Sequence, residues 1–127
     1  MLDDQRQFLY RMNILGLDYG EKHVGVALAE GPLAAPLTTL NTETAIPIIL
    51  DLVVKYQIEK IIVGDCPETF LKELEELGVE VEQSDETLSS HDARQMLMHT
   101  TQTRRKEKEH AVAATIILQN WLDTGNI

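Results

Sequence analysis

The sequence predicts an α/β protein in which helices flank a mixed, five-stranded sheet, and three observations lead to that prediction. Two extended segments near the beginning lie close enough in the chain to form an antiparallel hairpin. A β-branched segment at residues 60–64 has the composition of a central parallel strand. Beyond residue 44, helical and extended patterns alternate, which is typical of α/β folds.

The first third of the chain contains three predicted strands. Residues 13–18 begin with a short apolar run, and residues 23–29 alternate Val24, Val26 and Leu28 with smaller side chains. Residues 19–22 form the turn between these two strands. Residues 36–40 predict a third, weaker strand after a loop rich in Gly, Pro and Ala.

The middle of the chain predicts a helix, a strand, a second helix and a further strand. Residues 46–54 form a helix that Thr44 can cap and in which Pro47 is tolerated in the first turn. Its apolar positions are spaced as one stripe: Ile46, Ile49, Leu50, Val53 and Val54. Strand 60–64 precedes a helix at residues 67–77, which ends at Gly78. The inward side chains of that helix are Phe70, Leu71, Leu74 and Leu77. Residues 79–82 form a half-exposed fifth strand.

The last third of the chain predicts two helices separated by a loop. The first begins at Ser89 or Ser90 and ends near Met98. Residues 100–108 are polar and basic and are interpreted as the loop. The final helix covers residues 109–122, and residues 111–118 are apolar nearly all round it.

The composition bounds the class of protein. A chain of 127 residues with 43% hydrophobic side chains is large enough for a single domain with its own core. It contains no apolar run near the length of a membrane helix, and its charged first dozen residues are unlike a secretory signal. The single cysteine, Cys66, fits a small core position and a reducing, cytoplasmic location, and the scattered histidines exclude a zinc-finger site.

The charge of the chain restricts how it can meet nucleic acid. Its formal net charge is −10, which excludes non-specific coating of the polyanion. A local nucleic-acid site is still compatible with the sequence, because four cations occupy the five positions from 104 to 108: Arg104, Arg105, Lys106 and Lys108. Lys22 and Arg94 are further candidates for this site. This cluster is either a contact for a phosphate backbone or a solvated loop diluted by neighbouring glutamates. Aromatic residues, at 5%, are too few for a base-stacking platform.

Acidic side chains follow three of the predicted strands, at the edge where open α/β sheets bind ligands. Asp18 follows the first strand, and its position supports two interpretations: a cap for the turn, or a metal ligand. Asp85 and Glu86 follow the fifth strand, where they are either metal ligands or residues that cap a helix on a solvated surface, and the second interpretation is favoured for Asp85. Two strand-end carboxylates that meet in space require a divalent cation, and their hard oxygens favour Mg²⁺ or Mn²⁺.

Several stretches together resemble a known family. Residues 14–27, ILGLDYGEKHVGVA, are similar to the opening motif of the YqgF/RuvX family, ribonuclease H-like proteins described as Holliday junction resolvases and as nucleases that mature precursor 16S ribosomal RNA. Matching stretches follow in order at residues 35–37 (APL), 61–64 (IIVG), 85–90 (DETLSS) with 93–94 (AR), and 113–119 (AATIILQ). The family's chains usually start near residue 12, so residues 1–12 are either an N-terminal extension or a misassigned start, and residues 13–127 form the single domain.

The resemblance implies a ribonuclease H-like fold and metal-dependent cleavage of phosphodiester bonds with Mg²⁺ or Mn²⁺. It implies Asp18 and Glu86 as two metal ligands. The third family acid, on the first turn of the last helix, falls on His110, which either replaces it as a ligand or leaves the site weak or inactive. A neutral imidazole removes negative charge and shifts preference toward manganese or softer ions.

Two further interpretations concern neighbouring residues. Asp65 stands where family members usually have an apolar residue, and it is either an additional metal ligand or the N-cap of the next helix. The remaining histidines are expected on the surface: His23, His91 and His99.

Three functional hypotheses follow. The first is an endonuclease on structured nucleic acid, either in the maturation of precursor 16S rRNA or as a Holliday junction resolvase on branched DNA. The second is a catalytically silent, nuclease-derived binding module. The third is an ATP-binding enzyme, because the opening hairpin also resembles the phosphate motif of the actin and sugar-kinase fold, but 127 residues supply only one of the two domains that fold uses. The expected partners are structured RNA or branched DNA and no membrane, with the chain a monomer or a homodimer.

Overall fold

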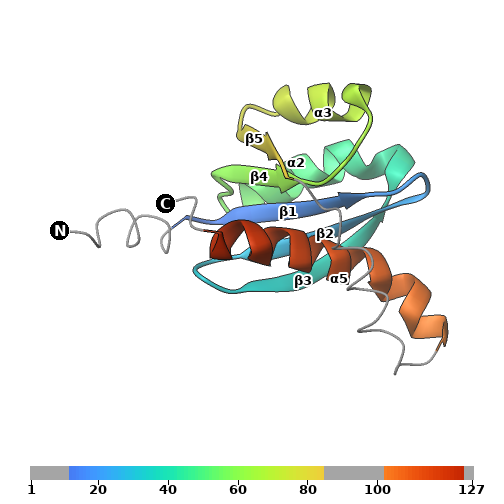
Figure 1. Ribbon diagram of the computed structural model, residues 1–127. Helices are drawn as coiled ribbons and strands as arrows, with labels where there is room; N and C mark the ends of the chain where they lie inside the picture. Colours follow the sequence, from blue (N-terminus) through green and yellow to red (C-terminus); the bar gives the residue numbers. More distant parts are fainter. Residues whose placement is uncertain (1–11, 85–101, 125–127) are drawn as a thin grey trace.

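The computed structural model describes residues 12–84 and 102–124, with side chains in the second range described from Glu109 onward. A five-stranded sheet lies between two helical layers (Figure 1). The strands are β1 (Ile14–Tyr19), β2 (His23–Ala29), β3 (Ala34–Asn41), β4 (Lys60–Val63) and β5 (Glu80–Gln83). Their order across the sheet is β3-β2-β1-β4-β5. The mixed, five-stranded α/β architecture predicted from the sequence is confirmed.

The sheet combines an antiparallel half with a parallel half. β2 pairs antiparallel with β1, Leu17 standing opposite Val26, and β3 pairs antiparallel with β2 across a register shift between Val26 and Ala27. β4 pairs parallel with β1, and β5 parallel with β4. Parallel strands need a crossover connection, and the helices between β3, β4 and β5 supply it. The carboxyl ends of β1, β4 and β5 therefore share one edge.

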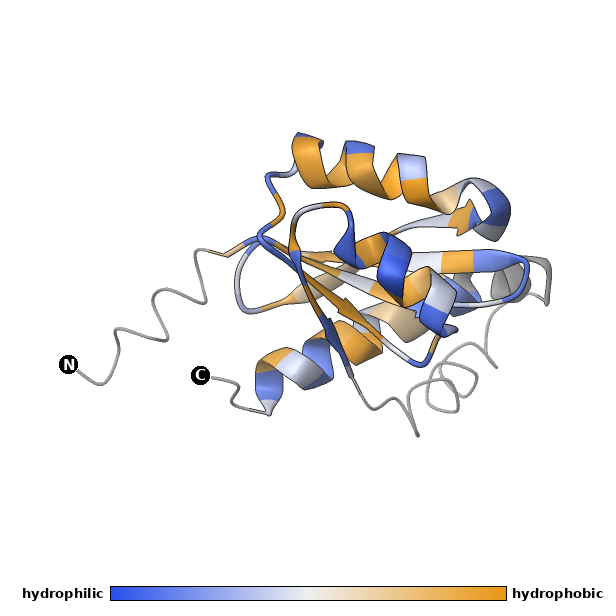
Figure 2. Cartoon of the chain, turned by 90° about the horizontal axis from the view of Figure 1, so that it is seen from above, coloured by the Kyte–Doolittle hydropathy of each residue, from blue (hydrophilic) through white to orange (hydrophobic). Residues whose placement is uncertain are grey.

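Alternation along β1 divides the core into two clusters. Leu15 and Leu17 face one side, where they pack beneath helices α2 (Ala45–Lys55) and α3 (Glu68–Glu75). Ile14 faces the other side, against helix α5 (Gln102–Asp123). Figure 2 shows hydrophobic colour along the strands and on the helices that cover them. In the two described ranges, no helix is both long and apolar enough to cross a membrane.

Helix α2 follows a short 3-10 turn, η1 (Thr42–Thr44), and its apolar stripe is narrower than predicted. Ile49 and Val53 are buried, but Leu50 is 41% exposed and Val54 is 70% exposed. Leu50 and Val54 lie on the flank of the helix, beyond the width of sheet available to cover them. Thr44 occupies the N-cap position without making a capping hydrogen bond from its side chain, because its backbone (φ −118°, ψ 13°) is not extended.

Helix α3 forms as its sequence pattern predicts. Phe70 and Leu74 are buried, and Leu71 and Leu77 pack against the same cluster. Gly78, just beyond the helix, has a φ of +88°, a conformation that glycine adopts without steric cost. Cys66 is partly buried against this core, which agrees with its interpretation as a small packing residue.

Helix α5 begins earlier than predicted. Residues 102–108 were expected to form a loop, but they are the first turns of α5, which starts at Gln102. These residues lack an apolar face, so their periodicity gives no sign of a helix, yet Gln, Arg, Lys and Glu are all strong helix formers. They extend a helix already nucleated by its packed C-terminal part. The predicted helix between residues 89 and 98 lies outside the described residues.

Candidate metal and nucleic-acid site

A buried carboxylate marks the end of β1. Asp18 is only 5% exposed, and it lies on the α5 side of the sheet, like Gly16 two residues before it. Burying an ionised carboxylate is costly unless a positive or hydrogen-bonding group meets it. The partner of Asp18 therefore decides what this end of the sheet can do.

The partner is His110, which is 92 residues away in sequence. Its Nδ1 lies 2.9 Å from Oδ2 of Asp18, and the histidine side chain is 30% exposed. The resemblance placed this residue on the first turn of the last helix, and that detail is wrong because α5 starts eight residues earlier, at Gln102. The helix thus brings an imidazole to the buried carboxylate at the carboxyl end of β1.

Glycines let α5 approach this closely. A Cβ atom at Gly16 would stand 2.7 Å from the Leu118 Cβ, and one at Gly25 would overlap the backbone carbonyl of His110. A Cβ at Gly20 would lie 2.8 Å from Cε1 of the same imidazole. These positions must lack a side chain for His110 to reach Asp18. Sequence reasoning did not identify them, although a glycine inside an alternating strand, such as Gly25, is a recognised sign of close approach.

The turn between β1 and β2, beside the site, is hydrogen-bonded to the 3-10 turn η1 that follows β3. The Thr42 hydroxyl donates to the Gly20 carbonyl at 2.7 Å, and its backbone N–H donates to the Lys22 carbonyl at 3.0 Å. Lys22 is exposed, as a nucleic-acid contact must be. His23 is exposed, as predicted, but its ring centroid lies 6.2 Å from that of His110, so it borders the site.

The other predicted ligands are differently placed. Asp65 is exposed just beyond β4, and the N-cap residue of α3 is Pro67, so the interpretation of Asp65 as that cap is wrong. Among the described residues, no three His, Cys, Asp or Glu side chains gather as a metal site. The predicted ligand Glu86 lies outside the described residues, as do Asp85, Arg94, His91 and His99. The pairing between β4 and β5 extends to Ser84, whose N–H donates to the Val63 carbonyl at 2.7 Å. Ser84 precedes Glu86 by two residues in the sequence.

The pair formed by Asp18 and His110 fits a divalent metal in its chemistry. A carboxylate oxygen and an imidazole nitrogen are both ordinary ligands of Mn²⁺ and related ions. Their 2.9 Å separation is that of a hydrogen bond.

Comparisons with known proteins place this arrangement in a family. A family model described as RuvX, Holliday junction resolvase, matches residues 12–124. This chain belongs to the RuvX family. A relative from Syntrophus aciditrophicus, named as a candidate pre-16S rRNA nuclease, is 38% identical over 88% of this chain and 89% of its own. A relative of the same name from Chloroflexus aggregans is 37% identical over 87% of this chain and 92% of its own.

Solved structures share the ribonuclease H-like fold of this RuvX chain. Thermus thermophilus RuvC in complex with a Holliday junction substrate matches with a TM-score of 0.53 at 14% identity, covering 90% of this chain and 96% of RuvC. The fowlpox virus resolvase, solved with Holliday junction DNA, matches with a TM-score of 0.63 at 8% identity, covering 91% of this chain and all of the resolvase chain. At such identities the likeness shows the fold alone.

The basic cluster of the RuvX chain leads directly to the site. All four cations belong to the first turns of α5, the helix that carries His110: Arg104, Arg105, Lys106 and Lys108. In Figure 1 this part of α5 projects past the edge of the sheet. The corrected helix thus ties the positions of these four residues to that of the imidazole.

The opposite end of α5 is held by a different polar cluster. Lys60 Nζ lies 2.8 Å from Glu80, 3.0 Å from Glu82 and 4.9 Å from the centroid of the Trp121 ring. The Trp121 Nε1–H donates to Glu82 at 2.7 Å. Burial disfavours the charged form of Lys60, but the hydrogen bonds and charges of the two glutamates outweigh it and raise the pKa of Lys60 above its usual value.

The pKa of Glu82 shifts in the opposite direction to that of Lys60. Burial alone would raise its pKa, but hydrogen bonds from Lys60 and Trp121 and the charge of Lys60 hold the pKa below its usual value. We call Lys60, Glu80, Glu82 and Trp121 the clamp. It joins β4, β5 and the end of α5.

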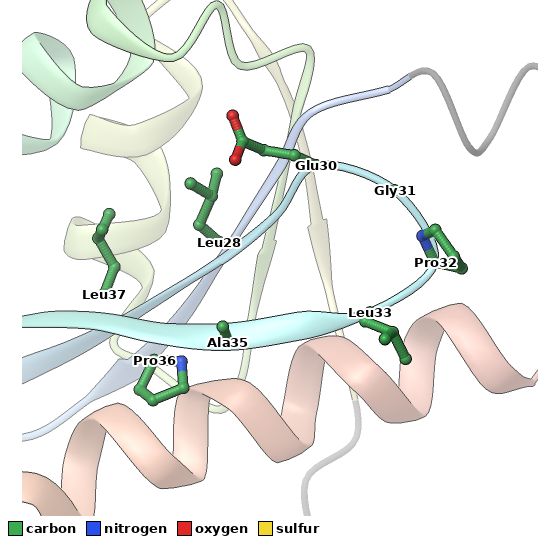
Figure 3. A pocket seen from close by; sticks show the side chains of 8 residues that line it. All are labelled: Leu28, Glu30, Gly31, Pro32, Leu33, Ala35, Pro36 and Leu37. Atoms are coloured by element: carbon green, nitrogen blue, oxygen red, sulfur yellow. The ribbon is translucent and has the colours of Figure 1, made fainter.

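A pocket of about 320 Å³ lies beside the β2–β3 loop (Figure 3). Leu28, Leu37 and Glu30 point into one side of it, and Leu33 lies toward α5. Ala29, next to this loop, pairs with Ile14 at the start of β1, whereas Asp18 is near the strand's end. The pocket is therefore separate from the pair formed by Asp18 and His110.

Proposed function

We propose that this RuvX-family protein is a divalent-metal-dependent endonuclease that hydrolyses phosphodiester bonds in structured nucleic acid. The observation that carries the proposal is the contact between buried Asp18 and His110 at the carboxyl edge of the parallel strands. A buried carboxylate beside an imidazole supports a metal centre at this strand end, because both side chains are ligands of divalent ions and buried charges are either paired or bound to metal.

Asp18, His110 and Glu86 are the proposed metal ligands and catalytic residues, with Asp65, just beyond β4, as a fourth ligand and third carboxylate. The ions proposed are Mg²⁺ or Mn²⁺. Such ions activate a water molecule and stabilise the leaving oxygen in phosphodiester hydrolysis. The protein's contribution is to hold the ligands on rigid elements: Asp18 on a central strand, and His110 on a helix locked against that strand by glycines.

The basic turns of α5 are the proposed contact for the phosphate backbone. Arg104, Arg105, Lys106 and Lys108 precede His110 on one helix, and Lys22 is exposed in the hairpin beside Gly20. Arg94 is a further proposed contact. Five or six cations on a chain of net charge −10 give weak binding that falls steeply with salt. The substrate is therefore selected by its shape and by the site.

The proposed substrate is precursor 16S rRNA, the substrate named for the relatives at 31–38% identity. The second candidate is branched DNA, favoured by the description of the matching family model. The two differ in assembly, because resolving a junction requires cuts in two strands and hence a homodimer, whereas trimming an RNA end needs one site. Either activity is proposed to operate in the reducing cytoplasm, which suits a chain with a single cysteine.

Cleavage of labelled structured precursor RNA and of a four-way DNA junction, each with Mg²⁺ and with Mn²⁺, tests the proposal. We expect cleavage of one substrate, faster with Mn²⁺, and at least a hundredfold loss in Asp18→Asn. The matched control is Asp51→Asn, an exposed aspartate on α2 that should leave the rate unchanged. Absence of cleavage by the folded wild-type protein with either metal would favour a silent binding module.

A further inference from the structure

The outer face of helix α2 is largely apolar. Ile48, Leu50 and Val54 are 37%, 41% and 70% exposed, and Pro47 is exposed on the same helix. In the part of the chain that the structure describes, the remaining exposed large hydrophobic side chain is Leu33, on the β2–β3 loop. Apolar side chains that gather on one helix, rather than lying singly over the surface, mark a contact surface.

Helix α3 packs on the same side of the sheet and has a different outer face. Its exposed residues include Glu68, Lys72, Glu73 and Glu75, and Lys72 Nζ lies 3.4 Å from the Glu68 carboxylate. A charged outer face of this kind is typical of a helix that stays in water. The apolar outer face of α2 is therefore not a general property of this helical layer.

The charges on the outer face of α2 indicate which partner fits it. The face carries one acid and one base, Asp51 and Lys55, so it is locally neutral on a chain of net charge −10. A basic partner would be attracted to the acidic parts of the surface instead. An acidic partner is repelled by most of the surface but not by a neutral face, and a second copy of this chain is such a partner.

We propose that two copies of this chain pair antiparallel along α2, across a two-fold axis. Residues four apart lie on one side of a helix, so Leu50 and Val54 form one row and Asp51 and Lys55 form the next. With the axis near the middle of the helix, Leu50 of one copy packs against Val54 of the other. Asp51 of one copy then meets Lys55 of the other. Each contact occurs twice, which is the self-complementarity that a two-fold interface requires.

The pairing leaves the candidate metal site uncovered in both copies. Helix α2 packs on the face of the sheet that Leu15 and Leu17 line, whereas Asp18 lies on the face that α5 covers. The outer face of a helix of 11 residues is small for a dimer interface, so the association should be weak and concentration-dependent. The proposal does not rest on the proposed nuclease, because the dimer needs neither metal nor nucleic acid.

Sedimentation of the full chain over a range of concentrations tests the proposal. We expect a monomer–dimer equilibrium in the wild type and dimerisation about tenfold weaker in Val54→Gln, because the substitution removes an apolar contact at both symmetric positions. The matched control is Leu33→Gln, which changes a side chain that is 76% exposed and lies away from α2. It should leave the equilibrium unchanged. Both substitutions are at exposed positions and should preserve the fold.

Charge reversal tests the antiparallel geometry. Asp51→Lys and Lys55→Asp should each abolish self-association, because like charges then face one another across the axis. The two variants mixed together should form a heterodimer, since every charge on one α2 then meets an opposite charge on the other. Glu73→Lys, on the outer face of α3, is the control and should not weaken the wild-type equilibrium.

Three results would overturn the proposal. A wild type that stays monomeric at millimolar concentration would leave the outer face of α2 to a different protein. A dimer that Leu33→Gln dissociates and Val54→Gln does not would place the interface at the β2–β3 loop. Charge-reversal variants that fail to associate when mixed would exclude antiparallel pairing along α2.

Discussion

The part of α5 that runs from His110 to the C-terminal end of the helix is fastened to the sheet differently at its two ends. At one end, His110 meets the buried carboxylate of Asp18 at 2.9 Å over glycines that leave no spare room. At the other end, the clamp joins Lys60, two partly exposed glutamates and Trp121 through several mutual contacts. Both ends are polar, but only the clamp balances its charges with partners of both signs.

This difference indicates which of the two clusters is suited to bind a ligand. In the clamp, Lys60 contacts both glutamates and Glu82 also accepts from Trp121, so these charges are balanced within the cluster. The site end concentrates a buried carboxylate and leaves an imidazole edge exposed. An ion-pair cluster such as the clamp supports structure, whereas a buried carboxylate beside a partly exposed imidazole is suited to binding. The predictions below disturb each end in turn.

Gly25→Ala should produce the largest effect, because the new Cβ would overlap the backbone of His110 and Ala111. The helix must move away, and we expect a loss of about 3 kcal/mol in the free energy of unfolding together with loss of metal binding. Urea denaturation measures the change in the free energy of unfolding. Gly78→Ala is the control, since its Cβ would meet nothing within 4 Å and its cost comes only from the positive φ. Equal stability losses in the two variants would contradict the close-packing explanation.

Lys60→Met should disturb the clamp alone. It removes the hydrogen bonds to Glu80 and Glu82 and the charge above Trp121, while the methionine keeps most of the packing. We expect a loss of about 1 kcal/mol in unfolding free energy and no change in metal affinity. Denaturation and metal titration on the same preparation check both parts. A large fall in metal affinity would show that the two ends are not independent.

The contribution of the clamp to the free energy of unfolding should depend on pH, and this effect should be smaller than those of the two substitutions above. The pKa of Glu82 is lowered, so its contribution is present above the usual value of 4.5 and is lost as the pH falls through the lower folded value. The pKa of Lys60 is raised, so its contribution is present below 10.5 and is lost as the pH rises through the higher folded value.

We therefore expect the stability difference between wild type and Glu82→Gln to be full from about pH 5 to pH 10 and to shrink in acid. Its size should stay below about 1 kcal/mol because Glu82 is partly exposed. Urea unfolding at pH 7 and at pH 3.5 measures it. A difference that grows in acid would contradict the assigned direction.

The sequence predicted most of the fold because its strands carry clear patterns. The alternation of Val24, Val26 and Leu28 and the β-branched run before Gly64 were sufficient to place β2 and β4. The first turns of α5 were missed because a helix without a core-facing stripe has no hydrophobic period to detect. Leu50 and Val54 were assigned to the core because periodicity gives the direction of a stripe and not the width of the surface that covers it.

The sequence predicted less of the site than of the fold. Asp18 attracted attention by its position after an apolar strand, but its meeting with His110 depends on how α5 crosses the sheet, 92 residues later in the chain. Family resemblance suggested that pairing, and the residues alone did not. The seat formed by Gly20 and Gly25 was missed, since a missing side chain is informative only once its neighbour is known.

Titration of Mn²⁺ into the wild-type protein, Asp18→Asn and Lys60→Met, followed by calorimetry, tests the division between the two ends of α5. We predict binding to the wild type and to Lys60→Met with equal affinity, and at least a tenfold weaker affinity in Asp18→Asn. Undiminished binding in Asp18→Asn would contradict a metal centre at the end of β1.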